Sequence, residues 1–212
     1  AAMDTAKEVG GDFYDFYFVG ENKLSFLIAD VSGKGIPAAM FMMTAKTIIK
    51  GYAEAGRPVD EVFTVANEKL CESNEAGMFV TAWMGVLDTV SGRVEFANAG
   101  HNPPLVRHAD GAFEYLRTKP NLVIAGMEGL RYRKNELTLA AGDEIFLYTD
   151  GVTEATNSQN ELYGEERLAA LLNRLHGLTG EELCRAVKAD IAAFVGDAPQ
   201  FDDITMLHLK YN

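Results

Sequence analysis

Acidic residues recur in this chain where predicted strands begin or end. Asp12 opens an aromatic-rich strand, and Asp30 closes the apolar run that follows it. Asp150 closes a later apolar run, and Asp202 and Asp203 directly precede the last one. Each of these residues alone is an ordinary turn residue. Carboxylates that converge to about 4 Å repel by roughly 4 kcal/mol at an effective dielectric constant near 20, so a convergent set requires a cation or raised pKa values.

The ligand type indicates which cation such a set would bind. Carboxylates without a His or Cys partner favour Mg²⁺ or Mn²⁺, with Ca²⁺ as an alternative. Two such ions about 3.5–4 Å apart can activate a water for attack on phosphorus. Gly33 and Gly35 follow Asp30 and give the backbone the freedom that metal and phosphate sites often use. Pro37 then fits the first turn of a helix.

A hairpin is expected to bring Asp12 and Asp30 to the same place. Its strands are predicted at 13–19 and 24–29, with a turn at 20–23. The first strand runs away from Asp12 and the second runs back toward Asp30. Both acids should therefore lie at one end of the hairpin.

Two helix pairs are expected, separated by strands. The first helix, 36–50, should end at Gly51 and bury a stripe formed by Ile36, Met40, Met43 and Thr47. The last helix should begin at a capping box, Thr179 to Glu182. The other predicted elements are helices at 58–72 and 165–175, a hairpin of 105–106 with 113–116 across Asp110-Gly111, a hairpin of 136–139 with 144–148, and strands at 78–87, 93–97 and 204–209.

This order of elements predicts the fold class and the domain organisation. Hairpins alternating with helix pairs indicate an α+β fold, an antiparallel β-sandwich with helix pairs on its outer faces. Residues 1–212 should form a single domain, excised from a longer chain with an N-terminal regulatory region.

Composition narrows the possible classes of protein. The chain has 212 residues and a net charge of −12, which argues against nucleic-acid binding and against docking on anionic lipid. No apolar run approaches a membrane span, and no signal peptide is visible. The two cysteines, Cys71 and Cys184, are expected to be buried free thiols, which favours a reducing, cytoplasmic setting.

Six motifs stand in the order found in one known family. They are Glu8-Val-Gly-Gly-Asp12-Phe-Tyr-Asp15, Asp30-Val-Ser-Gly-Lys-Gly-Ile-Pro-Ala38, Phe79-Val-Thr81, Asn98-Ala-Gly-His-Asn-Pro-Pro104, Tyr148-Thr-Asp-Gly-Val-Thr-Glu154 and Phe201-Asp-Asp-Ile-Thr205. In these motifs the chain resembles the SpoIIE/RsbU-type branch of the PPM (PP2C-like) serine/threonine phosphatases.

The resemblance implies two Mn²⁺ or Mg²⁺ ions in an acidic cleft and a bridging water as nucleophile. Asp30 would bridge the ions, and the carbonyl of Val31 would be a further ligand. Asp150 and Asp202 would bind one ion, and Asp12 would bind directly or through water. Asp203 is the alternative to Asp202. The implied substrate is a phosphorylated regulatory protein of the anti-anti-sigma type. The phosphatase domain would be controlled by an upstream sensor domain, and whether it forms a homodimer stays open. The family usually has a strand ahead of Glu8, and only residues 1–7 are left to form it, so that sheet edge is expected to be missing or supplied by a partner.

Other residues have simpler interpretations. Lys34 does not fit a P-loop, because Gly35 follows it instead of Ser or Thr. His101 is a candidate general acid but is expected to be structural, and Glu154 is expected to be a helix-start charge. The basic group Arg131, Arg133 and Lys134 is expected to be a solvated loop.

Two rival functions stay open from the sequence. One is a nucleotide cyclase, because Gly10-Gly11-Asp12-Phe13 resembles the cyclase motif, although that motif should lie in mid-domain. The other is a non-enzymatic partner-switching module of the same fold.

Overall fold

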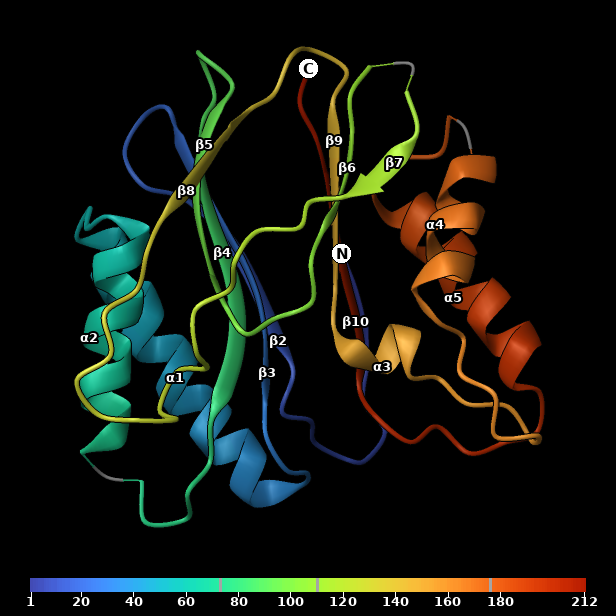
Figure 1. Ribbon diagram of the computed structural model, residues 1–212, viewed down its shortest axis with the longest axis horizontal. Coiled ribbons are helices and arrows are strands. Elements are labelled where there is room, and N and C mark those ends of the chain that lie inside the picture. Colours follow the sequence, from blue (N-terminus) through green and yellow to red (C-terminus); the bar gives the residue numbers. More distant parts are fainter. Residues whose placement is uncertain (73, 110, 176) are drawn as a thin grey trace. The chain divides into compact units, whose positions relative to one another are not determined.

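The computed structural model describes residues 1–72, 74–109, 111–175 and 177–212 (Figure 1). The chain forms two compact units. One comprises Val9–His101 and Lys119–Leu139, and the other comprises Ala1–Glu8, Asn102–Thr118 and Ala140–Asn212. Each unit contains one antiparallel sheet and its own helices. Among the described residues, no helix combines the length and apolar character needed to cross a bilayer.

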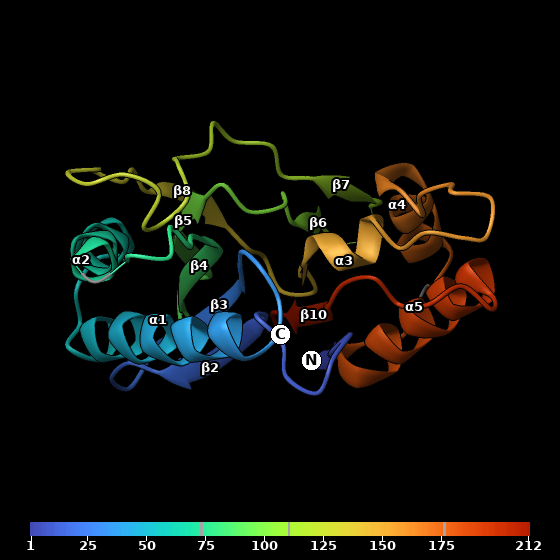
Figure 2. The same cartoon turned by 90° about the horizontal axis from the view of Figure 1, so that it is seen from below.

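The first unit is a five-stranded sheet in the order β2-β3-β4-β5-β8. Helices α1 (Ile36–Glu54) and α2 (Val59–Cys71) pack along one side of it, as Figure 2 shows. The predicted hairpin of 13–19 with 24–29 is confirmed. The strands are β2 (Phe13–Phe18), β3 (Lys23–Val31), β4 (Val80–Asp88), β5 (Arg93–Ala99) and β8 (Asn135–Thr138).

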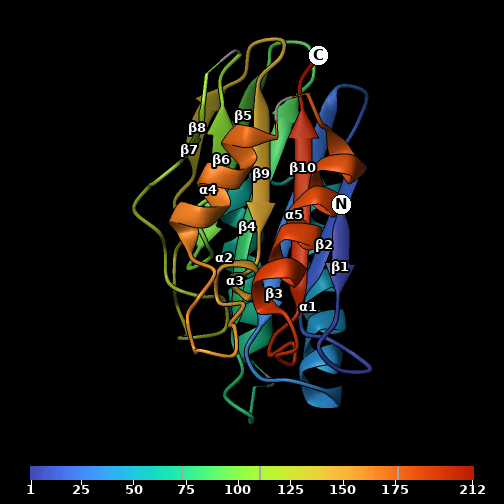
Figure 3. The ribbon, with the colours of Figure 1, turned by 90° about the vertical axis from the view of Figure 1, so that its right-hand side faces the viewer.

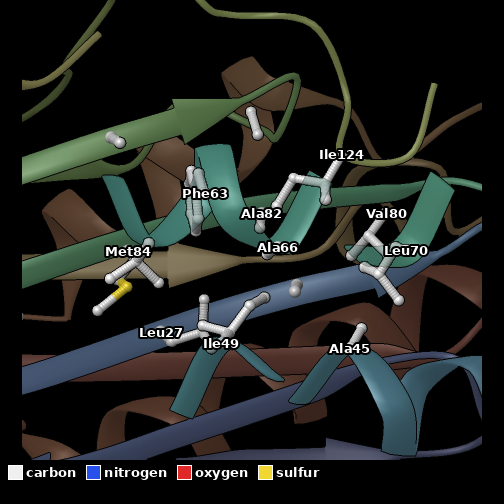
Figure 4. Packing of buried hydrophobic residues seen from close by; sticks show 14 of the residues in the cluster. Leu27, Ala45, Ile49, Phe63, Ala66, Leu70, Val80, Ala82, Met84 and Ile124 are labelled. Carbon is white, nitrogen blue, oxygen red and sulfur yellow. The ribbon is translucent and has the colours of Figure 1, made fainter. Parts of the chain in front are cut away.

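Apolar residues on both faces explain why the central strands read as continuous apolar runs. Leu27 and Ala29 of β3 join Val80, Ala82 and Met84 of β4 beneath the helices (Figure 4). The opposite face carries an aromatic group in which the Trp83 ring lies 5.4 Å from Phe26 and 5.1 Å from Phe96, measured between ring centroids. Such strands are typical of a sheet buried on both faces.

The predicted buried face of α1 is wrong. Ile36, Met40 and Met43 are 70%, 68% and 59% exposed. The residues that α1 buries are instead Ala38, Ala45, Ile49 and Ala53. Both faces of this helix are apolar, and small alanines allow the helix backbone to approach the sheet closely. Periodicity alone therefore could not identify the packed face.

The predicted end of this helix at Gly51 is also wrong, because α1 continues to Glu54. Ala53 extends the buried face by one more turn, and Gly56, with a φ of +75°, allows the turn that follows. Packing of this last turn outweighs the low helix propensity of glycine.

Replacing Gly51 by alanine should stabilise the protein. A Cβ at Gly51 would meet no described heavy atom within 4 Å, and its φ is not positive. Alanine in a helix interior is favoured by roughly 0.5–1 kcal/mol over glycine. We expect Gly51→Ala to raise the thermal midpoint by about 1–4 °C. A lower midpoint in calorimetry would contradict this account of α1.

The second unit is a five-stranded sheet in the order β1-β10-β9-β6-β7, with α5 packed along β10 and α4 against β7 (Figure 3). Its strands are β1 (Ala2–Asp4), β6 (Leu105–Arg107), β7 (Phe113–Tyr115), β9 (Glu144–Tyr148) and β10 (Ile204–Lys210). Its helices are α3 (Asp150–Thr153), α4 (Glu165–Arg174) and α5 (Gly180–Val195).

Four expectations bear on the strands and helices of this unit. The edge strand is not missing: β1 forms from the chain itself and pairs with β10. The predicted hairpin of 136–139 with 144–148 is wrong, because β8 pairs with β5 in one sheet and β9 lies in the other. Helix α5 begins where predicted, but the Thr179 side chain makes no capping hydrogen bond. The β6–β7 hairpin is confirmed, and Asp110 of its predicted turn lies outside the described residues.

A buried ionic group lies where β9 begins and β10 ends. Glu144 is fully buried and accepts a hydrogen bond from Arg107 at 2.6 Å. Burial alone would raise the pKa of Glu144, but Arg107 and the neighbouring positive charges hold it below its ordinary value. The Gly180 N–H donates to Nδ1 of His208, so Nε2 carries the proton that faces Glu144 at 3.0 Å.

This arrangement predicts a loss of stability in mild acid. Burial lowers the pKa of His208, and protonating Nδ1 would break the bond from Gly180. In the unfolded chain this histidine binds its proton near pH 6.5, which is before the folded protein binds it as the pH falls. The free energy of unfolding therefore decreases below about pH 6.5, by at most about 1.4 kcal/mol per pH unit for this group. Thermal melts between pH 7.5 and 5 should show the fall, and His208→Gln should reduce its slope. Equal slopes in both proteins would contradict this assignment.

Candidate metal centre

Asp12 and Asp30 lie at the same end of the β2–β3 hairpin, as predicted. Phe13 pairs with Ala29, and the two acids follow one residue further along the strands. Asp12 is 2% exposed, and Asp30 is half-buried. The strand does not stop before Asp30 but continues through Val31, so the acid is held by the sheet rather than by a turn.

The carbonyl of Val31 lies against the glycine pair that precedes Asp12. A Cβ at Gly11 would come within 2.8 Å of this oxygen, so only glycine leaves the space beside it open. Ser32 fixes the next peptide with two bonds to Phe79: its N–H donates to the Phe79 carbonyl, and its hydroxyl accepts from the Phe79 N–H, both at 2.9 Å. Gly33 and Gly35 follow with φ values of +90° and +78°, as a glycine-dependent loop requires.

The second unit carries the other acids. Asp150 is the first residue of the short helix α3, and Asp202 immediately precedes Asp203 and β10. A Cβ at Gly151 would overlap the carbonyl oxygen of Asp203 and lie 3.4 Å from the Cβ of Asp202. The start of α3, with Asp150 as its first residue, therefore lies directly against the Asp202–Asp203 segment.

Asp202 and Asp203 have different surroundings. Asp203 is 7% exposed, and its Oδ1 accepts a hydrogen bond from the Ala6 N–H at 2.8 Å, which fastens the segment after β1. Asp202 is half-buried, and its Oδ1 accepts from the Asp203 N–H at 2.9 Å. The contact with Ala6 gives Asp203 a structural role and favours Asp202 as the ligand.

These donors fit a hard divalent cation. Every candidate ligand is a carboxylate or carbonyl oxygen, the set that Mg²⁺ and Mn²⁺ prefer. The gap beside the Val31 carbonyl, which a Cβ at Gly11 would fill, agrees with a carbonyl kept accessible. Within the part of the chain that the structure describes, no three His, Cys, Asp or Glu side chains are gathered as a metal cluster. Asp12 and Asp30 lie in one unit, and Asp150, Asp202 and Asp203 lie in the other.

His101 occupies the structural role expected for it. It is 6% exposed, and its main chain and the Asn98 side chain exchange two hydrogen bonds of 2.8 and 2.9 Å. Its Nδ1 lies 2.9 Å from the hydroxyl of Thr81, which pairs with Asp30 across β3 and β4. Thr81 and Ser32 are therefore supporting residues that the sequence did not single out, although both lie within motifs of the resemblance.

The basic loop residues also behave as expected. Arg131 faces Glu68 at 3.5 Å, and Lys134 faces Glu95 at 3.3 Å, each at the surface of the first unit. Exposed pairs of this kind contribute little to stability.

Comparison with known proteins identifies the family. A family model described as Stage II sporulation protein E (SpoIIE) matches residues 20–212, which is most of the chain. The chain therefore belongs to the SpoIIE family. The PP2C domain of SiaA from Pseudomonas aeruginosa, a solved structure, matches with a TM-score of 0.85 at 25% identity, over 100% of this chain and 84% of that one. The expected PP2C-like α+β fold is confirmed.

Two curated relatives are longer than this chain. Protein IcfG of Synechocystis sp. is 28% identical over 100% of this chain and 37% of its own length. Phosphoserine phosphatase RsbU of Bacillus subtilis is 29% identical over 97% of this chain and 60% of its own length. The chain thus spans less than two thirds of either relative.

Proposed function

We propose that this chain is a metal-dependent phosphatase that removes phosphate from phosphoserine or phosphothreonine on a regulatory protein. The observation that carries the proposal is the set of acids at strand and helix ends, of which Asp30, Asp150 and Asp202 lie within the residues that the SpoIIE family model matches. The similarity to phosphoserine phosphatase RsbU supports the same reaction class.

Asp30, the Val31 carbonyl, Asp150 and Asp202 would hold two Mn²⁺ or Mg²⁺ ions, with Asp12 in support directly or through water. When bound, the ions supply an activated water and offset the charge on the phosphoryl group. The carboxylates orient that centre, and burial of Asp12 strengthens its electrostatic effect. None of these residues is assigned as a covalent nucleophile.

The proposed substrate is a small phosphoprotein of the anti-anti-sigma type. We propose that residues 1–212 act as one phosphatase domain within a longer protein, controlled by an upstream regulatory region. The greater lengths of IcfG and RsbU are compatible with this organisation.

Phosphate release tests the reaction. The purified chain with saturating Mn²⁺ or Mg²⁺ should hydrolyse an aryl phosphate and a phosphoserine peptide, and excess chelator should stop both reactions. Incubation with GTP, followed by product chromatography, should give no cyclised or linked nucleotide. Activity that persists in chelator would contradict the metal mechanism, and nucleotide products would favour the cyclase instead.

A further inference from the structure

A largely apolar pocket of about 270 Å³ lies in the unit that carries Asp150 and Asp202. Ile191 and Val195 of α5 line it together with Ile204 at the start of β10. Gly151 and Asp202 also line it, so the pocket adjoins two of the segments proposed to hold the metal ligands.

Polar contacts fix the wall of this pocket. Lys188 of α5 forms a 2.7 Å ion pair with Asp4 of β1. The Gln200 amide donates to the carbonyl oxygens of Asp4 and Asp202, at 3.0 and 2.8 Å. These contacts join the helix, the edge strand and the loop before β10. Phe201 in that loop is 73% exposed and adds an aromatic edge to the opening.

Size and charge indicate the occupant. The volume lies just below the range of about 300–1,000 Å³ typical of small-molecule sites, so one or two side chains fit better than a whole organic ligand. The charged residues that line it are three carboxylates and one ammonium: Asp4, Glu154, Asp202 and Lys188. Asp4 pairs with Lys188, and Asp202 belongs to the proposed metal centre, which leaves Glu154 as the lining carboxylate that is complementary to a cationic residue beside an apolar one.

We propose that the pocket binds an apolar side chain, flanked by lysine or arginine, from the phosphorylated segment of the protein substrate. This inference rests on the proposed function, because the pocket shares Asp202 with the proposed metal centre. An apolar anchor beside the phosphoserine would hold the phosphate over the ions, and burial of such a side chain changes affinity by about 10- to 100-fold. The pocket would thereby select the substrate by the residues next to its phosphoserine.

Phosphoserine peptides test this selection. A glycine-serine peptide would carry a Leu-Lys pair moved through each of the four positions on either side of the phosphoserine. Phosphate release gives kcat/KM for every peptide. With Leu-Lys in at least one of these positions, we expect kcat/KM to exceed that of the peptide without Leu-Lys by about 10-fold or more.

Two neighbouring alanines of α5 provide a matched pair of variants. Ala192 lines the pocket, whereas Ala193, which is also exposed, is not among the described lining residues. Ala192→Leu should reduce the preference to less than about 3-fold, and Ala193→Leu should keep it. Glu154→Gln should weaken the contribution of the peptide lysine, measured against a Leu-Ser peptide.

The outcomes separate the pocket from the reaction. The pocket assignment is overturned if the wild-type chain cleaves all the peptides equally well. It is also overturned if Ala192→Leu keeps the preference, or if both alanine variants lose it equally. If neither the peptides nor an aryl phosphate is hydrolysed, the proposed function is overturned, and the pocket assignment with it.

Discussion

Asp30→Asn is expected to lower phosphate release by at least about 100-fold, the upper loss seen when a residue that merely supports a metal ligand is removed. The amide keeps the size and shape of the carboxylate but loses its negative charge, and asparagine is a poorer ligand for a hard cation. Asp150→Asn should behave alike. Both variants should retain the fold, because removing a charge from an acidic group relieves repulsion.

The measurement is kcat/KM for aryl-phosphate hydrolysis at saturating Mn²⁺, with circular dichroism as the check on folding. Asp197→Asn is the matched control, since Asp197 is an exposed loop residue outside the proposed centre. It should retain activity within about two-fold. Near-normal activity in Asp30→Asn or Asp150→Asn, in folded protein, would exclude these carboxylates as ligands.

Gly151→Ala should have the second-largest effect, through sterics alone. Gly151 does not have a positive φ, so alanine fits its backbone conformation. The added Cβ would overlap the Asp203 carbonyl oxygen, which is backbone and cannot rotate aside. Relief requires α3 and the Asp202–Asp203 segment to separate, which displaces Asp150 from Asp202. Overpacking of this kind costs about 1–3 kcal/mol.

We therefore expect Gly151→Ala to lower the thermal midpoint by about 2–12 °C and to weaken Mn²⁺ binding by at least about 10-fold. Gly51→Ala is the matched control, because it adds the same methyl group in open space and should raise the midpoint. A Gly151→Ala protein with unchanged midpoint and metal affinity would show that α3 does not need this close approach.

Local pattern predicted much of the fold, and its failures have a common cause. The β2–β3 hairpin and the helix from Glu165 follow from residues close in sequence, and both are confirmed. The face of α1 was wrong because Ile36 and Ile49 lie on different sides of a helix that is apolar nearly all round. The partners of β8 and β9 are distant in sequence, so their neighbouring turn suggested a hairpin that does not form.

In the candidate site too, some features follow from local sequence and others only from the folded chain. Strand ends locate Asp12 and Asp30 from the sequence, since register is a local property of a hairpin. The roles of Gly11 and Gly151 depend on which backbone carbonyl lies opposite each of them, and only the folded chain provides that. The difference between Asp202 and Asp203 likewise depends on Ala6, about 200 residues away in sequence.

Calorimetric titration with Mn²⁺ tests the central claim most directly, because a degenerate binding module and an enzyme differ in metal binding. The wild-type chain should bind two ions, and Asp30→Asn should lose at least one of them or weaken both by more than about 10-fold. Two ions bound equally well by wild type and Asp30→Asn, or no ion bound by wild type, would contradict the proposed centre.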